Sequence, residues 1–306
     1  MTAAVNWFNL YWLLFGGLLI IVSALFFYRG ISSSFKERRQ LLAERFDRRT
    51  KLVTGVLLLA FLSIAAYNYY NVNYLNNYLT KTELDKRAIA FEKTLKKYQH
   101  LPLPKVTRLQ LHTDLYPDKQ QAFVHAVLHV VNKNAAPIEK LLLDAEGLTA
   151  YTVKQNGIPV PYNSPLLYPR GFFNFFRPAK DTADFRLYQF QKPLAPGDST
   201  VLEIISSTMF AGFSNDLYGG NLIRNGTFFD LGLPGLGYDD DDELNSPYER
   251  KKAGLPPKEE EEIAQDDPEG TSTLKAGKAS DLLQLEMTIS TVADQTVIAP
   301  GELQKQ

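Results

Sequence analysis

Two long apolar stretches near the N-terminus constrain this chain most. Residues 10–28 contain no charged side chain, and residues 52–70 are also uncharged. About 20 apolar residues are enough for a helix to cross the hydrocarbon core of a bilayer. Uncharged stretches of this length are rare in the core helices of soluble proteins. The sequence therefore predicts two transmembrane helices within residues 1–80, which form a helical hairpin.

A cleaved signal peptide is the alternative for the first stretch, and it fits poorly. No basic residue precedes the apolar run, and the bulky residues Phe27, Tyr28 and Arg29 follow it in place of a small-residue cleavage site. The second stretch continues into five tyrosines between residues 67 and 78. Amphipathic tyrosine rings are typical of the membrane–water interface. Both stretches are therefore expected to span the membrane.

The loop between the two stretches is basic. Residues 29–51 contain eight lysines or arginines against three acidic residues. Short loops with such an excess stay in the cytoplasm, so everything after the second span is expected outside. Anionic lipids explain this charge as well as a nucleic acid would, and the whole chain has a formal charge of -1. The sequence therefore predicts the lipid bilayer, and no nucleic acid, as a partner.

The stretch after the second span changes to an amphipathic pattern. Residues 82–98 place apolar side chains among charged ones, with Thr82 as the expected N-cap. Pro102 and Pro104 remove backbone donors and favour extended conformations, so the helix should end before them. Residues 81–101 are therefore predicted to form a stalk helix, and a new domain is predicted over residues 102–306.

That domain is predicted to be mostly β-structured. Apolar and polar residues alternate over residues 105–153, and the pattern returns near the C-terminus, after residue 281. The pair Asn156-Gly157 is a strong hairpin signal, and the PLAPGD segment links two further strands. The predicted fold class is thus two transmembrane α-helices and a juxtamembrane helix, followed by a mostly antiparallel, β-sandwich-like domain outside the membrane.

Acidic runs interrupt this domain at residues 239–243 and 259–262. The second run lies in a stretch rich in proline, lysine and glycine. Calcium binding is the alternative, but the spacing of an EF-hand, with its glycine and terminal glutamate, is missing. Residues 239–279 are therefore predicted to form a solvated, flexible acidic loop.

The histidines are the first candidates for a metal site. His125 and His129 have the histidine spacing of the helical zinc motif HExxH. In this chain Ala126 replaces the glutamate that serves as general base, and the segment has the periodicity of a strand. His100 and His112 are isolated in the sequence, and the chain has no cysteine for a disulfide or a thiolate site. We therefore predict no metal ligand, no catalytic residue and no cofactor-binding residue in this chain.

An aromatic cluster between two turns has two interpretations. It could line a ligand cage, but aromatic residues in such a position more often belong to a core or a domain interface, and we adopt that interpretation. Its members are Phe172, Phe173, Phe175 and Phe176.

Several segments in order resemble one bacterial fusion family. In that family an ABC-type, multi-span permease is followed by an aminopeptidase N-like zinc peptidase of the gluzincin class. The resemblance covers roughly residues 85–306 and involves the juxtamembrane segment and the N-terminal β-domain. The segments that carry it are residues 91–120, 130–144, 188–199, 225–238 and 290–306. The resemblance implies a multi-pass protein of the bacterial cytoplasmic (inner) membrane, with its β-domain on the periplasmic side.

The departures from that family define what the chain is expected to do. It contains no HExxH, no third zinc ligand, no Gly-x-Met-Glu-Asn loop and no nucleotide-binding P-loop. By resemblance, zinc and the peptide substrate belong to a missing catalytic domain, and other permease spans are implied partners. The chain then looks like an interior piece, ending at Gln306 near where the peptidase domain would begin. It would be a non-catalytic anchor and β-domain. The alternative is a free-standing, membrane-anchored module that binds a partner outside the membrane.

Overall fold

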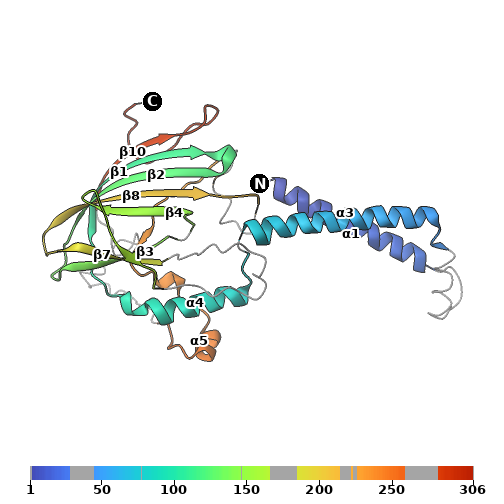
Figure 1. The fold of residues 1–306 in the computed structure, drawn as a ribbon, viewed down its shortest axis with the longest axis horizontal. Coiled ribbons are helices and arrows are strands. Elements are labelled where there is room, and N and C mark those ends of the chain that lie inside the picture. The colour runs from blue at the N-terminus through green and yellow to red at the C-terminus, as the bar shows by residue number, and fades with distance from the viewer. Residues whose placement is uncertain are drawn as a thin grey trace. The chain divides into compact units, whose positions relative to one another are not determined.

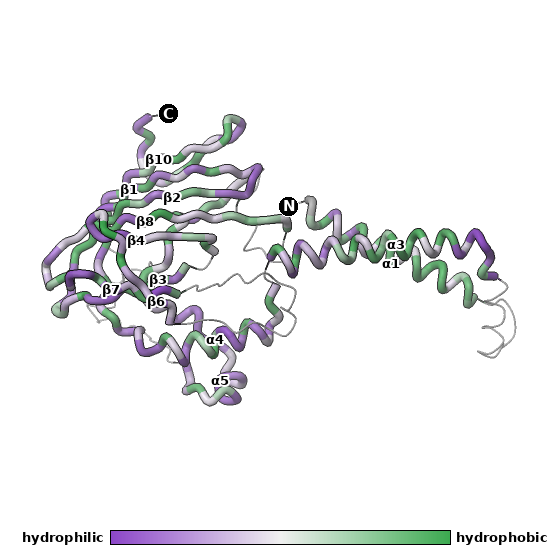
Figure 2. Tube along the Cα trace, viewed as in Figure 1, coloured by the Kyte–Doolittle hydropathy of each residue, from purple (hydrophilic) through white to green (hydrophobic). Residues whose placement is uncertain are grey.

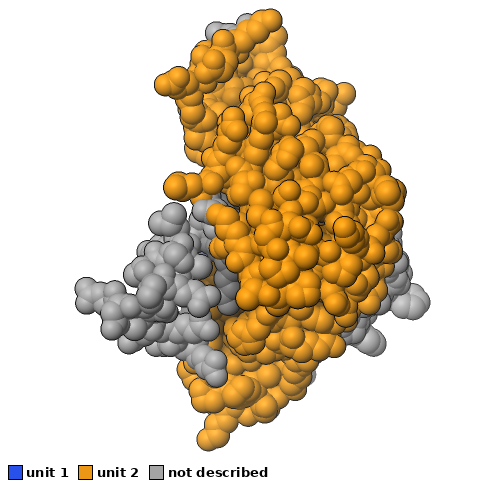
Figure 3. Space-filling view, turned by 90° about the vertical axis from the view of Figure 1, so that its left-hand side faces the viewer, with its two compact units in different colours: residues 1–78, 211–220 blue, residues 79–210, 221–306 orange. Residues whose placement is uncertain are grey.

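The chain folds into two compact units in the computed structural model. The first, the helical unit, contains residues 1–78 and 211–220, and the second, the β-unit, contains residues 79–210 and 221–306. Figure 1 shows their elements, and Figure 3 shows the surface of the β-unit. The residues that the structure describes are 2–27, 45–76, 78–145, 147–165, 185–213, 222, 226–258 and 282–305.

The helical unit contains the two predicted apolar helices. Helix α1 spans Thr2–Phe26, helix α3 spans Arg48–Tyr69, and a π-helical segment, Tyr70–Leu75, follows. Helix α3 begins at a polar cap, because the Asp47 side chain accepts a hydrogen bond from the Thr50 amide at 2.8 Å. Both helices are long and apolar enough to cross a membrane, and the most apolar window of each buries none of its residues. Figure 2 shows this apolar character along both helices.

Aromatic contacts join α1 and α3 in antiparallel order. The rings of Trp7 and Tyr67 lie 4.7 Å apart between their centroids, and those of Phe15 and Phe61 lie 5.7 Å apart. An early residue of α1 thus meets a late residue of α3. The two predicted apolar helices are therefore present, and they lie antiparallel to each other.

A short segment distant in sequence completes the helical unit. The Asn76 side-chain amide donates hydrogen bonds to the carbonyl groups of Ala211 and Phe213, at 2.9 and 3.0 Å. The Phe213 ring lies 5.9 Å from the Tyr67 ring. These contacts explain why residues after 210 belong to the helical unit rather than to the β-unit.

The β-unit contains two sheets. The strands of the larger sheet are β1 Lys105–Tyr116, β2 Gln121–Val131, β4 Ala150–Gln155, β5 Ile158–Pro159, β8 Ser199–Met209 and β10 Gln284–Ser290. The strands of the smaller sheet are β3 Ile138–Asp144, β6 Tyr162–Asn163, β7 Phe185–Leu194 and β9 Gly235–Leu236. Their orders are β10-β1-β2-β8-β4-β5 and β6-β7-β3-β9.

The pairing of these strands confirms a mostly antiparallel fold with one exception. The predicted turn at Asn156 and Gly157 joins β4 to β5, and both residues have the positive φ angles, 51° and 81°, that such a turn requires. Strand β10 instead pairs with β1 in parallel. Leu141 of the smaller sheet lies in the same core as Leu111 and Leu202 of the larger one. The predicted sandwich is confirmed only in that two sheets share one core.

Helix α4, Lys81–Leu95, differs from the predicted stalk. Its N-cap is Thr80 rather than Thr82, because Glu83 then occupies the position that completes a capping box. Phe91 and Leu95 are buried in a second core, which also contains Leu142, Phe185, Leu187 and Tyr238. The apolar face of α4 therefore packs into the β-unit.

The first half of the predicted acidic loop also differs from the expectation. It contains a 3₁₀ helix, Asp240–Asp242, and helix α5, Pro247–Ala253. Ser246 caps α5 at its start, and Gly254 ends it in a left-handed conformation with φ 70°. The acidic composition indicated a flexible loop, but the capping residues stabilise short helices in this segment. The second acidic run and residues up to 279 lie outside the described residues.

Candidate functional site

The histidines singled out from the sequence lie on the outer face of the larger sheet. His125 and His129 belong to β2, where their neighbours Ala126 and Leu128 are buried, so the histidines point away from the core. This confirms the predicted strand. Four positions along a strand span about 13 Å, which is too far for both rings to bind one zinc ion. The spacing of His125 and His129 on a strand therefore differs from the spacing of the two histidines on the helix of an HExxH site.

One histidine that looked isolated in the sequence has a neighbour in the fold. His112 of β1 lies directly opposite His125 of β2 in the register of the sheet. Sequence reasoning missed this pair, because the register of two strands depends on the turn between them. The His125 Nε2 atom lies 2.9 Å from Glu203 Oε1 on β8, and Lys154 Nζ on β4 donates to Glu203 Oε2 at 3.1 Å. These residues form a polar row across four strands.

The charge of this row is centred on Glu203. The hydrogen bond from Lys154 is the largest cause that lowers the pKa of the Glu203 carboxyl group, and the contact with His125 lowers it further. The row lies on the solvent-facing side of the sheet. Its chemistry is that of a surface ion-pair network.

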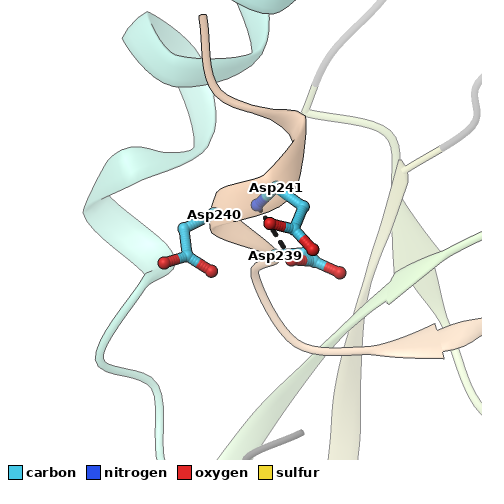
Figure 4. A group of neighbouring side chains, drawn as sticks. All are labelled: Asp239, Asp240 and Asp241. Carbon is cyan, nitrogen blue, oxygen red and sulfur yellow. Dashed lines mark hydrogen bonds between the residues drawn. The ribbon is translucent and has the colours of Figure 1, made fainter. Parts of the chain in front are cut away.

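Three neighbouring carboxylates form the second candidate for a metal site (Figure 4). The side-chain oxygens of Asp239, Asp240 and Asp241 lie within 4.8 Å of one another, and all three residues are exposed. Asp239 Oδ1 accepts a hydrogen bond from the Asp241 amide at 3.0 Å, which caps the short helix. Calcium requires six to eight oxygen ligands, and no other carboxylate, histidine or cysteine joins this group among the described residues. The contact that the structure shows for this group is the helix cap formed by Asp239.

A buried ion pair joins α4 to α5. Arg250 donates to both carboxylate oxygens of Glu92, at 2.6 and 2.8 Å, and the side chains of both are only 3% exposed. Arg250 also donates to the carbonyl groups of Leu244 and Pro256, at 2.8 and 2.7 Å. No local sequence signal predicts this pair, because its members are 158 positions apart. It is a structural contact that orders residues 239–258.

A second carboxylate lies next to this pair. Glu243 accepts a hydrogen bond from the Tyr238 hydroxyl at 2.8 Å and forms an ion pair with Lys96 at 2.5 Å. Burial, together with the adjacent Glu243 carboxylate, raises the pKa of Tyr238 above its ordinary value. The Tyr238 hydroxyl therefore stays protonated and acts as a donor.

The remaining predicted feature, the aromatic cluster at residues 172–176, lies outside the described residues. Among the residues described, Asp239, Asp240 and Asp241 are the only set of three potential metal ligands that lie close together. The described part of the chain thus contains no arrangement that fits the zinc site of a gluzincin.

Comparisons with known proteins find only distant similarity. No family model matches the chain, and no curated protein matches it. Among solved structures, an M1 zinc metallopeptidase from Deinococcus radiodurans is 19% identical with a TM-score of 0.25, over 37% of this chain and 21% of that chain. Native yeast LTA4 hydrolase is 17% identical with a TM-score of 0.24, over 35% and 14%. This chain spans about a fifth or less of the length of these proteins, and scores this low support no assignment.

Proposed function

We propose that the chain is a membrane anchor that carries a non-catalytic β-domain. The observation that carries this proposal is the exposure of apolar side chains on α1 and α3. Leu13 and Ile20 are each 71% exposed, and Leu52 and Leu59 are 70% and 69% exposed. A continuous apolar surface of this kind is unfavourable in water, whereas lipid tails cover it at no cost.

The charge of the connecting loop supports one orientation in the membrane. Basic residues in short loops hold those loops in the cytoplasm. Residues 29–51 have that excess, so the β-unit lies on the outer side of a bacterial cytoplasmic membrane in this proposal.

The ordered sequence resemblance supports a more specific role. In this role, the β-unit is the N-terminal β-domain of an aminopeptidase N-like zinc metallopeptidase that is joined to permease spans. Zinc and the peptide substrate would be bound by a peptidase domain that supplies HExxH, a motif that this chain lacks. The β-unit would then act by supporting that domain rather than by chemistry of its own.

Fusions to alkaline phosphatase test the anchor and its orientation. We expect an active fusion after Gln306 and an inactive fusion after Lys51, with the chain resistant to alkaline carbonate extraction. N-terminal sequencing of the mature protein distinguishes a span from a signal peptide, because a start near residue 29 would show that α1 is removed. The reverse activity pattern, or complete extraction by carbonate, would overturn the proposal.

Metal analysis tests the non-catalytic part. Zinc hydrolysis usually needs three protein ligands, an open position for water and a general base. We expect the purified chain to bind no stoichiometric zinc and to release no residue from a chromogenic aminoacyl substrate. A longer chain that includes a downstream peptidase domain, where the gene encodes one, should do both. One equivalent of zinc with chelator-sensitive activity from residues 1–306 alone would refute this part.

A second candidate function is a free-standing module that binds a protein partner outside the membrane. One observation favours it, which is an exposed sheet edge beside an apolar groove in the β-unit.

A further inference from the structure

Strand β10 is an edge strand. It pairs with β1 from Arg108 opposite Gln284 to Asp114 opposite Ser290, and no described strand pairs with its other side. The outer side of an edge strand presents backbone N–H and C=O groups that can pair with another chain. The seven residues of β10 thus offer a template for one additional strand.

The two faces of β10 have different chemistry. On one face, Glu286 accepts hydrogen bonds from Gln110 and Arg108, at 3.0 and 3.3 Å, and is therefore tied to β1. On the other face, Met287 and Ile289 lie opposite Leu111 and Thr113, and Leu111 and Thr113 point into the β-unit. An added strand would extend this apolar face of the sheet.

A groove of about 790 Å³ lies along that apolar face. Its floor includes Leu111, Met287 and Ile289, and its walls come from residues 226–231 and 294–298. Phe228 and Ile298 line it while being 84% and 96% exposed. Apolar side chains this exposed beside a groove are typical of a binding surface.

The polar groups of the groove limit what can occupy it. Its ionisable side chains are two exposed aspartates, Asp230 and Asp294, and it contains no lysine or arginine among the described residues. Thr113 also lines it, but its hydroxyl is buried. A partner with basic groups complements the two aspartates.

We infer that the groove and the edge of β10 bind an extended peptide segment of another protein. The segment pairs with β10 through its backbone, places apolar side chains at alternate positions in the groove, and carries lysine or arginine near Asp230 and Asp294. Addition of a strand to a sheet edge is an established mode of peptide recognition. A second copy of this chain fits less well, because its own Asp230 and Asp294 would add like charges. The inference does not depend on the proposed peptidase relationship.

Three fluorescent peptides test the mode of binding to the full chain in detergent. The first has seven alternating valines and threonines with a lysine at each end, and the second has glutamates at the ends. The third repeats the first but carries N-methyl groups on alternate amides, which removes backbone pairing without changing side chains. We expect the first to bind, the second to bind about tenfold more weakly, and the third to lose binding. Equal binding of the three, or binding of none, would overturn the inference.

Matched variants test the place of binding. Asp230→Asn combined with Asp294→Asn should weaken the lysine-ended peptide about fivefold, whereas Asp198→Asn in the exposed turn before β8 should not change it. Phe228→Ser should also weaken binding, while Tyr248→Ser, on α5 and 74% exposed, should leave it intact. These exposed side chains contribute little to folding. Unchanged affinity in both groove variants would place the peptide elsewhere and refute the site.

Discussion

The helical unit and the β-unit contain the same kinds of apolar side chain, but they use them in opposite ways. Leu95 and Leu202 of the β-unit are 0% exposed, whereas Leu59 of α3 is 69% exposed. The β-unit removes its leucines from water by packing them on one another. The helical unit leaves its leucines outward, so its stability depends on what surrounds it.

Polar groups repeat this contrast. Two buried polar side chains of the β-unit find partners inside it, as Glu92 has Arg250 and as the Asn132 amide has the carbonyl groups of Ala136 and Leu194. In the helical unit the hydrogen bonds of Asn76 gather at the end of α3, beyond its apolar stretch. A core can therefore accept polar groups where they are paired. Within α3 the Ser63 hydroxyl likewise donates to the carbonyl group of Leu59, at 2.8 Å.

Breaking the buried ion pair should cause the largest loss of stability, and this loss should be confined to the β-unit. Arg250→Ala leaves Glu92 buried and unpaired, which typically costs about 3–5 kcal/mol. We expect that loss in guanidinium unfolding of the β-unit, followed by far-ultraviolet circular dichroism. Fluorescence of Trp7 and Trp12, the two tryptophans of the chain, both in α1, should not change.

The control for this change is Lys252→Ala, also on α5. The Lys252 side chain is 68% exposed and its ion pair with Glu249 lies at the surface, so the loss should stay within about 0.5 kcal/mol. Equal losses for Arg250→Ala and Lys252→Ala would contradict a buried structural role for Arg250.

Truncating a buried leucine of α4 is the next test. Leu95→Ala removes a side chain that is 0% exposed, and such changes cost about 2–5 kcal/mol. Leu84→Ala, on the same helix and 51% exposed, should cost far less. If the two variants unfolded at the same denaturant concentration, Leu95 would contribute no packing between α4 and the β-unit.

The helical unit is tested by adding a charge to the exposed apolar surface of α3, rather than by removing a buried group. Leu59→Arg should hinder membrane insertion, at a cost of about 2.5–3.5 kcal/mol for a charge near the centre of a span. The carbonate-resistant fraction should fall, while unfolding of the β-unit stays unchanged. Leu59→Phe is the control and should insert normally. An unchanged carbonate-resistant fraction for Leu59→Arg would mean that α3 does not cross the membrane.

Local patterns predicted the parts of the fold that local physics determines. The apolar stretches indicated α1 and α3, the alternation indicated β1 and β2, and Asn156-Gly157 indicated a turn. The packing of α4 was missed because its partners lie far along the chain, at Leu142 and Arg250. An amphipathic helix shows that one face is buried, but the sequence does not show against what.

Register and strand direction were missed for a similar reason. Alternation placed His112 and His125 on strands, but only the turn between β1 and β2 sets them opposite each other. Strand β10 follows a long intervening stretch and pairs in parallel with β1, and its own sequence carries no sign of that direction. The peptide groove depends on both the direction and the edge position of β10, so the sequence could not indicate it.

The smallest effect is expected from pH, on the polar row of the larger sheet. The hydrogen bond from Lys154, followed by that from His125, lowers the pKa of Glu203 below its ordinary value of 4.5. A carboxyl group whose pKa is lower in the folded state stabilises the fold above the unfolded value, and this contribution is lost as the pH falls through the folded value. Glu203→Gln should therefore reduce stability at pH 7 by less than about 1 kcal/mol, as is usual for surface pairs.

The difference between Glu203→Gln and the unsubstituted chain should shrink as the pH falls below 4.5, because the wild-type carboxylate is then protonated as well. Glu139→Gln, an exposed change on β3, is the control and should show no such dependence. Unfolding curves collected between pH 7 and about pH 3 measure both variants. A difference that stayed constant over this range would show that Glu203 contributes through packing rather than through its charge. The polar row would then stabilise the β-unit by packing, as the residues of its core do, and not by charge.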